Sequence, residues 1–270
     1  MIWAANARMY SMPAATAAAW KEVLAWTAQQ SGVELAVVDH AFPAPLSALW
    51  SREDLGCAFM CGLPWIRSRS RPKPIAAPVP SPARYADRPV YMTDLIVRAD
   101  SPFRTLEDTF GARLGFTVED SHSGFNALRH HLLPHRIARA ADLYRQSVGP
   151  LHTPRRVIDA VLAGDIDVGP LDGYALDLML KHDPELAARI RVIATSDAAP
   201  IPFLVASPSC PDDVVERLRE PLLRLHLDTA CDWLRQALLL SRFVRVETKA
   251  YALIADWDRA AIAAGYAVPG

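Results

Sequence analysis

The residues best suited to chemistry lie in the segment 120–129, between a predicted strand and a predicted helix. Ser121 and Ser123 offer hydroxyl donors, and Gly124 allows close approach to backbone N–H groups. The first turn of a helix carries unsatisfied N–H groups and about half a positive charge from the aligned peptide dipoles. The segment therefore predicts an anion site. Plain helix capping by Asp120 or Ser121 explains the same residues, and both interpretations stay open.

Two further polar segments follow predicted strands. His152 and Thr153 stand at a strand-to-helix junction, where either could donate a hydrogen bond to an anion. A structural role is the competing interpretation, since many histidines only satisfy local hydrogen bonds and threonine is a common helix cap. Asp172 ends an apolar strand. It could bind an amine or hydroxyl of a ligand, or cap the next helix.

Cys61 and Gly62 end another predicted strand, where a glycine permits close backbone approach. A catalytic thiol at Cys61 is one interpretation, and packing of a buried cysteine is the other. Ser123, His152 and Asp172 are the residue types of a hydrolase triad, but a triad is defined by geometry rather than by type. The sequence contains no GxSxG, HExxH, Walker or GxGxxG motif. We therefore expect a binding protein without catalytic residues.

Disulfide and metal sites are not indicated. The chain has four cysteines, Cys57, Cys61, Cys210 and Cys231. Four are too few for a disulfide scaffold in a chain of 270 residues, and no CxxC pair suggests zinc. His131 and His135 are four residues apart, but we expect Pro134 to end the helix that would align them. No metal and no cofactor are predicted.

Composition and charge describe an ordinary globular chain. The sequence has 29 Lys+Arg and 30 Asp+Glu, a net charge of −1, and 51 % hydrophobic residues. This balance argues against nucleic acid as a partner and against electrostatic membrane binding. No apolar run reaches the roughly 18 residues that a membrane span requires, so no membrane insertion is expected. The N-terminus shows no basic start followed by an apolar stretch, so no signal peptide is visible.

Strand-like runs alternate with helix-like segments along most of the chain, which predicts an α/β fold. We expect two similar lobes, each a mostly parallel sheet flanked by helices. Lobe 1 is predicted to comprise residues 1–92 with 200–270, and lobe 2 residues 93–199. Two lobes joined by two crossings predict a ligand cleft at the hinge, because open α/β sheets bind ligands at the carboxyl ends of their strands.

Capping residues predict where several helices begin and end. Ser11 and Pro13 indicate a helix start, with the serine as N-cap and the proline in the first turn. Gly32 is expected to stop that helix. In the second lobe a helix is expected over 123–133, with Pro134 at its end.

An ordered set of short motifs resembles a known family. The motifs are, in chain order, Met9-Tyr10, Leu49-Trp50, Cys61-Gly62-x-Pro64, Tyr91-x-x-x-x-Ile96-Val97-Arg98, Asp120-Ser121-x-Ser123-Gly124-x-Asn126-x-Leu128-Arg129, Gly149-x-x-His152, Ala163-Gly164-Asp165-x-Asp167-x-x-x-x-Asp172 and Pro200-x-Pro202. They span nearly the whole chain up to about residue 206. The set is similar to the phosphate/phosphite/phosphonate-type solute-binding proteins of ABC transporters, which have the type 2 periplasmic-binding-protein fold.

The resemblance implies a small oxyanion ligand held between the lobes. Ser121, Ser123 and the Gly124 N–H would hold the oxyanion, with His152 as a further donor, and Asp172 would read the other end of the ligand. The full set of residues that it implies for ligand binding is Ser121, His122, Ser123, Gly124, His152, Thr153, Asp172, Tyr10, Cys61, Gly62, Tyr91 and Thr93.

The resemblance also implies an ABC permease as partner and a periplasmic location. A cytoplasmic location follows instead if Met1 is the true start of the chain. We expect a monomer. A cytoplasmic ligand sensor, or a cofactor-biosynthesis enzyme on the same fold, is the alternative function, because fold alone does not decide function.

Overall fold

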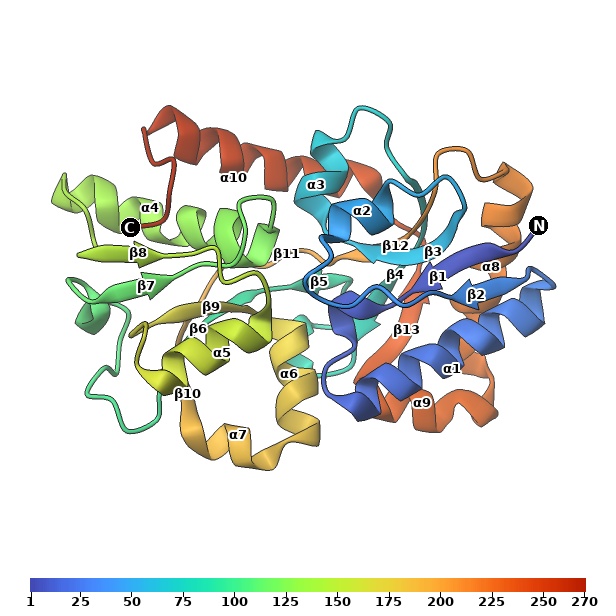
Figure 1. Cartoon of the computed structure of the whole chain (residues 1–270), viewed down its shortest axis with the longest axis horizontal. Coiled ribbons are helices and arrows are strands. Elements are labelled where there is room, and N and C mark those ends of the chain that lie inside the picture. The colour runs from blue at the N-terminus through green and yellow to red at the C-terminus, as the bar shows by residue number, and fades with distance from the viewer. The chain divides into compact units, whose positions relative to one another are not determined.

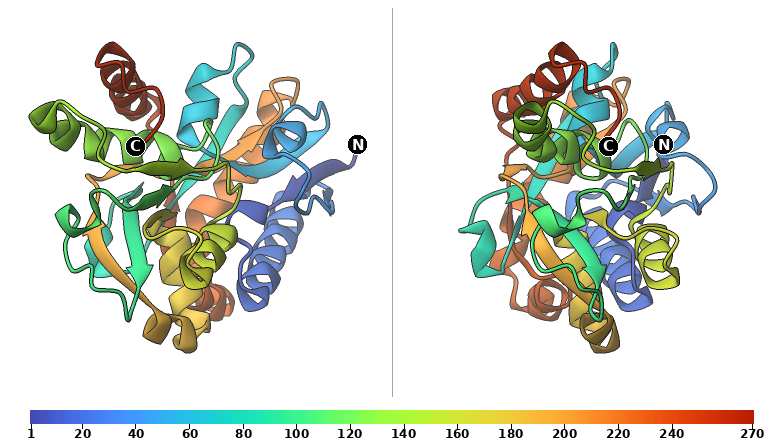
Figure 2. Two further views of the ribbon diagram at one scale, coloured as in Figure 1. Left: turned by 60° about the vertical axis from the view of Figure 1, so that its left-hand side comes forward. Right: turned by 90° about the vertical axis from the view of Figure 1, so that its left-hand side faces the viewer.

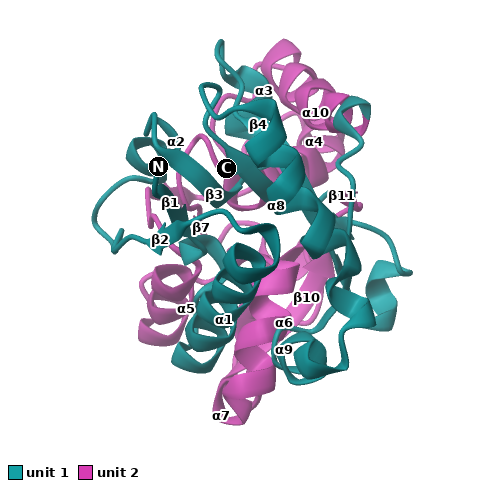
Figure 3. Ribbon diagram, turned by 90° about the vertical axis from the view of Figure 1, so that its right-hand side faces the viewer, with its two compact units in different colours: residues 1–90, 200–249 teal, residues 91–199, 250–270 magenta.

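The computed structural model describes all 270 residues and divides the chain into two compact units (Figure 3). Unit 1 comprises residues 1–90 and 200–249, and unit 2 comprises residues 91–199 and 250–270. The chain thus passes from one unit to the other three times. The first two crossings lie inside the short strands β5 (Val90–Tyr91) and β11 (Ala199–Pro200), which pair with each other.

The predicted lobe boundaries differ from these units at the C-terminus. Residues 250–270 were expected to complete lobe 1, but they belong to unit 2. The reason is that helix α10 (Ala252–Ala263) packs along helix α4 (Ala127–Arg139), as Figures 1 and 2 show. The first boundary falls at residues 90 and 91 rather than at 92 and 93.

Unit 1 is built on a six-stranded sheet with the order β13-β4-β12-β3-β1-β2. Its strands are β1 (Trp3–Asn6), β2 (Leu35–Val37), β3 (Leu55–Met60), β4 (Lys73–Pro80), β12 (Phe203–Ala206) and β13 (Leu240–Val244). Strand β1 runs parallel to β2 and β3, whereas β12 runs antiparallel to β3 and β4, and β13 antiparallel to β4. The expectation of a mostly parallel sheet is wrong here, because the two strands that return from the later part of the chain enter the sheet in the opposite direction.

Helices surround this sheet. They are α1 (Ala14–Ser31), α2 (Leu46–Trp50), α3 (Gly62–Arg67), α8 (Asp212–Arg224) and α9 (Asp232–Ala237). Short 3-10 turns are η1 (Arg8–Tyr10), η2 (Ala83–Tyr85), η5 (Leu225–Leu227), η6 (Thr229–Cys231) and η7 (Thr248–Tyr251). The third crossing between the units lies inside η7. Helix α1 ends at Gly32 as predicted, with φ at 62°. The predicted Ser11 cap is wrong, because its hydroxyl donates to the Ala7 carbonyl and Pro13 precedes α1.

Aromatic rings fill the core of unit 1. Phe59 of β3 lies between the edges of two rings, Tyr10 at 5.0 Å and Trp20 at 4.9 Å between centroids. All three side chains are almost fully buried. Edge-to-face pairs of this kind add about 0.5–1.5 kcal/mol beyond the area they bury.

Unit 2 contains two small sheets. Its strands are β6 (Thr93–Arg98), β7 (Arg113–Gly115), β8 (Gln146–Val148), β9 (Gly169–Asp172) and β10 (Ile190–Thr195). Strand β6 is central and antiparallel to both β9 and β10, while β7 runs parallel to β8. The mostly parallel sheet predicted for this lobe is therefore also wrong in detail, although the α/β class is correct.

The helical segments of unit 2 are η3 (Glu107–Thr109), η4 (His122–Asn126), α4, α5 (Pro154–Ala163), α6 (Gly173–His182), α7 (Pro184–Arg189) and α10. η4 is a single π-helical turn that leads directly into α4. The prediction that Pro134 ends this helix is wrong, since α4 continues to Arg139 with Pro134 inside it. No helix of the chain combines the length and the apolar character needed to cross a bilayer.

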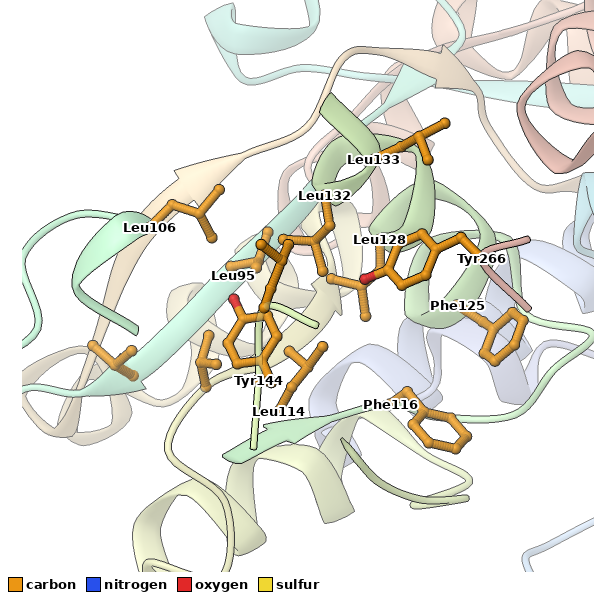
Figure 4. Packing of buried hydrophobic residues seen from close by; sticks show 13 residues of the cluster. Leu95, Leu106, Leu114, Phe116, Phe125, Leu128, Leu132, Leu133, Tyr144 and Tyr266 are labelled. Atoms are coloured by element: carbon orange, nitrogen blue, oxygen red, sulfur yellow. The ribbon is translucent and has the colours of Figure 1, made fainter. Parts of the chain in front are cut away.

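The core of unit 2 joins α4 to both sheets (Figure 4). Leu128 and Leu132 of α4 are fully buried in one cluster with Leu95 of β6 and Leu114 of β7. Tyr266, from the last residues of the chain, belongs to the same cluster and is 2 % exposed. The C-terminal segment is thus part of the core that supports the first turn of the η4–α4 helix.

Candidate functional site

The segment that follows β7 leads into the η4 turn, and Thr117 links its parts. The Thr117 N–H donates to the Gly124 carbonyl at 3.2 Å, and the Thr117 carbonyl accepts from the His152 N–H at 3.3 Å. The Thr117 hydroxyl is buried and has no hydrogen-bond partner within the protein. It lies directly against Gly124, because a Cβ atom added to that glycine would be 1.9 Å from Thr117 Oγ1. One residue therefore fixes the η4 turn and the His152 segment to the same strand end.

The η4 turn is capped by Ser121. Its hydroxyl accepts from the Gly124 N–H at 3.0 Å, so capping, one of the two interpretations of this segment, is observed. The Asn126 N–H reaches back to the Ser121 carbonyl at 3.1 Å, which gives the wide π-helical turn. The Gly124 N–H is occupied by this cap. The Ser123 N–H lies in the first turn of the helix, where no preceding turn supplies an acceptor.

Among the residues predicted to hold the oxyanion, Ser123 has a hydroxyl that forms no hydrogen bond within the protein. The residue is 9 % exposed. Its carbonyl is held by the Thr93 hydroxyl at 3.1 Å, and the Thr93 N–H is in turn bound to Ser196 Oγ at 2.9 Å. Thr93 therefore acts through its hydroxyl on the backbone of the turn. These hydrogen bonds tie the backbone at Ser123 to strand β6 and to Ser196.

His122 has its ring in the interior of unit 2. The residue is 1 % exposed and stacks on Trp257 of α10, with ring centroids 5.4 Å apart and planes 24° apart. Tyr91 lies against it at 5.9 Å, and Asn126 Nδ2 donates to His122 Nδ1 at 3.1 Å. Burial lowers the pKa of His122 to about 3, so the ring is neutral at neutral pH. His122 brings no positive charge to an anion bound at this turn.

We predict that the free energy of unfolding falls in acid because of His122. The folded form stays neutral down to about pH 3, whereas the unfolded side chain takes up a proton below its ordinary pKa of 6.5. The unfolded state then binds more protons, and this one group lowers the free energy of unfolding by about 2 kcal/mol at pH 5. Denaturant unfolding at pH 7 and pH 5, compared between the native chain and His122→Phe, measures the effect. Equal pH dependence of the two proteins would contradict it.

Asp172 lies at the same end of unit 2 as the η4 turn. It ends β9 and pairs across the sheet with Thr93, which holds the Ser123 carbonyl. The Asp172 carboxylate accepts from the Ala175 N–H at 3.0 Å and so caps α6, while the residue keeps 8 % exposure. The structure therefore brings Tyr91, Thr93, Asp172 and the η4 turn together within unit 2.

His152 and Thr153 adjoin this group through Thr117. His152 is exposed and has a left-handed backbone with φ at 67°, and its N–H is bound to Thr117. Thr153 caps α5, since its hydroxyl accepts from the Arg156 N–H at 3.3 Å. The capping interpretation of Thr153 thus matches the structure, and a ligand contact by either residue stays a prediction.

The three remaining predicted residues belong to unit 1. Tyr10 is 2 % exposed and packs on Phe59, and Cys61 is 6 % exposed just before α3, whose first residue is Gly62. None of the cysteines of the chain forms a disulfide. That these three residues contact a ligand stays a prediction.

Sequence reasoning missed the residues that support the η4 turn from behind. Arg129 is 2 % exposed and forms an ion pair with Asp258 of α10 at 2.5 Å. Asn126 Nδ2 donates to the Ile254 carbonyl of the same helix at 2.9 Å. An arginine on the apolar side of a helix was a signal for such a buried pair, but its partner 129 residues away was not visible in the sequence.

A separate groove of about 970 Å³ in unit 1 lies between α1 and α8. Two of its charged groups already have partners: Arg217 donates to the carbonyls of Ser31 and Gly32, and Glu216 is paired with Arg245. It contains none of the predicted ligand residues. We therefore place the candidate site at the η4 turn and not in this groove. No group of three or more His, Cys, Asp or Glu side chains is arranged to hold a metal ion.

Comparison with solved structures assigns the fold class. The binding-protein component of an ABC phosphonate transporter from Pseudomonas aeruginosa superposes with a TM-score of 0.79 at 16 % identity, covering 95 % of this chain and 85 % of that one. PhnD1 from Prochlorococcus marinus MIT 9301, solved with methylphosphonate, gives 0.72 at 15 % identity, with 96 % and 97 % covered. A Xanthomonas citri protein bound to ATP gives 0.68 at 17 % identity, with 97 % and 98 % covered. The fold is that of the type 2 periplasmic binding proteins, as predicted.

The family follows from the sequence match. The chain matches the model of the family described as ABC transporter, phosphonate, periplasmic substrate-binding protein over residues 10–251. It belongs to that family, whose members are substrate-binding proteins and not enzymes. A search of curated proteins finds no significant match. The resemblance drawn from the ordered motifs is confirmed.

Proposed function

We propose that the chain captures a small phosphorus oxyanion, a phosphonate, phosphite or phosphate, for an ABC importer. The observation that carries the proposal is the Ser123 hydroxyl at the head of the η4–α4 helix, buried to 9 % exposure and without a protein partner. Ser121 supports it, because a hydroxyl that accepts from the Gly124 N–H keeps its own hydrogen to donate outward. Family membership makes an oxyanion the fitting class of ligand.

The ligand's charge would be met by neutral donors at this turn. The His122 ring is neutral and faces α10, and Arg129 is engaged by Asp258. Hydroxyls, the leading N–H groups and the helix dipole remain to interact with the anion. Selectivity would then come from donors that the wrong ligand leaves unpaired, a penalty of about 1–3 kcal/mol for each group. His152 and Asp172 extend the proposed site toward the rest of the ligand.

The proposal places the chain in the periplasm, where a permease of the ABC type would receive the ligand. It is supported by the family, whose description names both the transporter and the compartment. The bound methylphosphonate of the Prochlorococcus protein makes that compound the natural first probe.

The test is calorimetric titration of the full chain with methylphosphonate, phosphite, phosphate and sulfate. Saturable binding of at least one phosphorus oxyanion is expected, together with an increase in Tm. A ligand at 100 times its Kd stabilises the folded state by about 2.7 kcal/mol, which for a chain of this size is a rise of several degrees. Absence of binding by all phosphorus oxyanions would overturn the proposal.

Ser123→Ala is predicted to weaken binding of the preferred ligand by about 10- to 100-fold, because a hydrogen bond to a charged group contributes about 1.5–3 kcal/mol. Combined with His152→Ala it should abolish binding while the fold is kept. Ser51→Ala, an exposed serine that bonds only within α2, is the control and should bind normally. Normal binding by the double variant would show that the η4 turn is not the ligand site.

A further inference from the structure

The first turn of the candidate site is held by a helix from the far end of the chain. Helix α10 contacts η4 and α4 through three different kinds of interaction. The Ile254 carbonyl accepts from Asn126 Nδ2 at 2.9 Å, Asp258 pairs with Arg129 at 2.5 Å, and Trp257 stacks on His122. Two of these contacts reach residues inside the π-helical turn itself.

Trp257 is the most central of these contacts. Besides His122, its ring also stacks on His130 of α4, with centroids 4.1 Å apart and planes at 4°. Two imidazoles and one indole thus form an aromatic layer between the two helices, in which Trp257 and His122 are buried and His130 is half-buried. Trp257 is the only tryptophan of unit 2, because the other six lie in residues 1–90 and 200–249.

The layer acts on the backbone that presents the oxyanion donors. His122 is the residue between Ser121 and Ser123, so the direction of its side chain sets the direction of both neighbouring hydroxyls. Burial in this layer keeps the His122 ring neutral, and Asn126 fixes its Nδ1 atom. A turn that carries an extra residue is a wider hydrogen-bonded ring than a regular helical turn and is frequent at functional sites. Packing against α10 supplies the restraint that holds it in one conformation.

We propose that Trp257 is a positioning residue of the ligand site: acting through His122, it holds the η4 turn in the conformation that directs Ser121 and Ser123 at the oxyanion. This inference rests on the proposed function for its ligand, and on the structure alone for its effect on the turn. Its consequence is that affinity for the oxyanion depends on a side chain that does not touch it.

The test compares Trp257→Leu, which removes the stacked ring, with Trp257→Phe, which keeps one. Phe243→Leu is the matched control, since Phe243 is also a buried aromatic residue but belongs to β13 of unit 1, where it packs on Trp20. Calorimetric titration with methylphosphonate is run at a temperature at which every variant is folded. Trp257→Leu should bind at least about tenfold more weakly, Trp257→Phe within about threefold of the native chain, and Phe243→Leu with native affinity despite a lower Tm.

Amide hydrogen exchange without ligand gives the second readout. Exchange at residues 121–126 should accelerate in Trp257→Leu and remain native in Phe243→Leu. Native exchange in this segment and native affinity in Trp257→Leu would overturn the inference. If the native chain binds no phosphorus oxyanion, the proposed function fails, and the exchange data still decide whether Trp257 holds the turn. Should Trp257→Leu not fold, Trp257→Met, which fills more of the same space, takes its place.

Discussion

Asp258→Ala should reduce the free energy of unfolding by about 3–5 kcal/mol, the cost of leaving a buried charge without its partner. The guanidinium of Arg129 is 3 % exposed and meets the Asp258 carboxylate at 2.5 Å. Its other contacts are the carbonyls of Tyr266 and Ala267 and the amide oxygen of Asn126, which are neutral acceptors. None of them replaces the lost negative charge. Urea unfolding at neutral pH measures the loss.

Two comparisons make this prediction specific. The exposed pair of Arg155 and Asp159 lies on the surface of α5, and Asp159→Ala should cost less than about 1 kcal/mol. Replacing both partners, Arg129→Leu with Asp258→Leu, should destabilise far less than Asp258→Ala alone, because no uncompensated charge then remains inside. If Asp258→Ala and Asp159→Ala cost the same, the buried pair does not hold α10 to α4.

Gly124→Ala should abolish oxyanion binding and destabilise unit 2. An added Cβ would meet Thr117 at 1.9 Å from Oγ1, 2.7 Å from Cγ2 and 2.8 Å from Cβ. These are side-chain atoms attached to the strand end that fixes the turn, so the turn itself must move. We expect affinity for methylphosphonate to fall more than about 100-fold and stability by about 1–3 kcal/mol, the range for overpacking a buried site. Titration calorimetry and thermal unfolding record the two effects.

A second substitution separates the clash from a general effect of the alanine. Thr117→Ala removes the two shortest contacts, and combined with Gly124→Ala it should recover part of the lost stability. The coupling between the two positions, measured by a double-mutant cycle, should therefore be favourable. Additive losses would mean that Thr117 and Gly124 do not touch in solution.

Much of the candidate site was predictable because its signals are local. Serine, glycine and a preceding strand within a few residues indicated the η4 turn, and Thr153 and Asp172 showed their capping chemistry in the same way. Such signals describe only interactions between residues that are close together in the sequence. They could not show that the Gly124 N–H is used by the Ser121 cap, or that the ring of His122 faces inward to Trp257.

The errors in the fold have a common cause. Strand direction in the two sheets, the path of α4 through Pro134 and the placement of residues 250–270 depend on contacts between distant parts of the chain. Pro134 illustrates this, since the proline breaks one hydrogen bond of the helix, but the two buried leucines just before it, Leu132 and Leu133, hold the helix against the core. Local preference was overridden by packing, which single-sequence patterns do not contain.

The interleaving of the two units has a consequence for the order in which the chain acquires structure during synthesis. Unit 2 receives Tyr266, a core side chain, from a segment that is synthesised after all of unit 1. Helix α4 therefore cannot complete its packing until α10 and Tyr266 have been synthesised, and unit 1 has its whole sequence before unit 2 does.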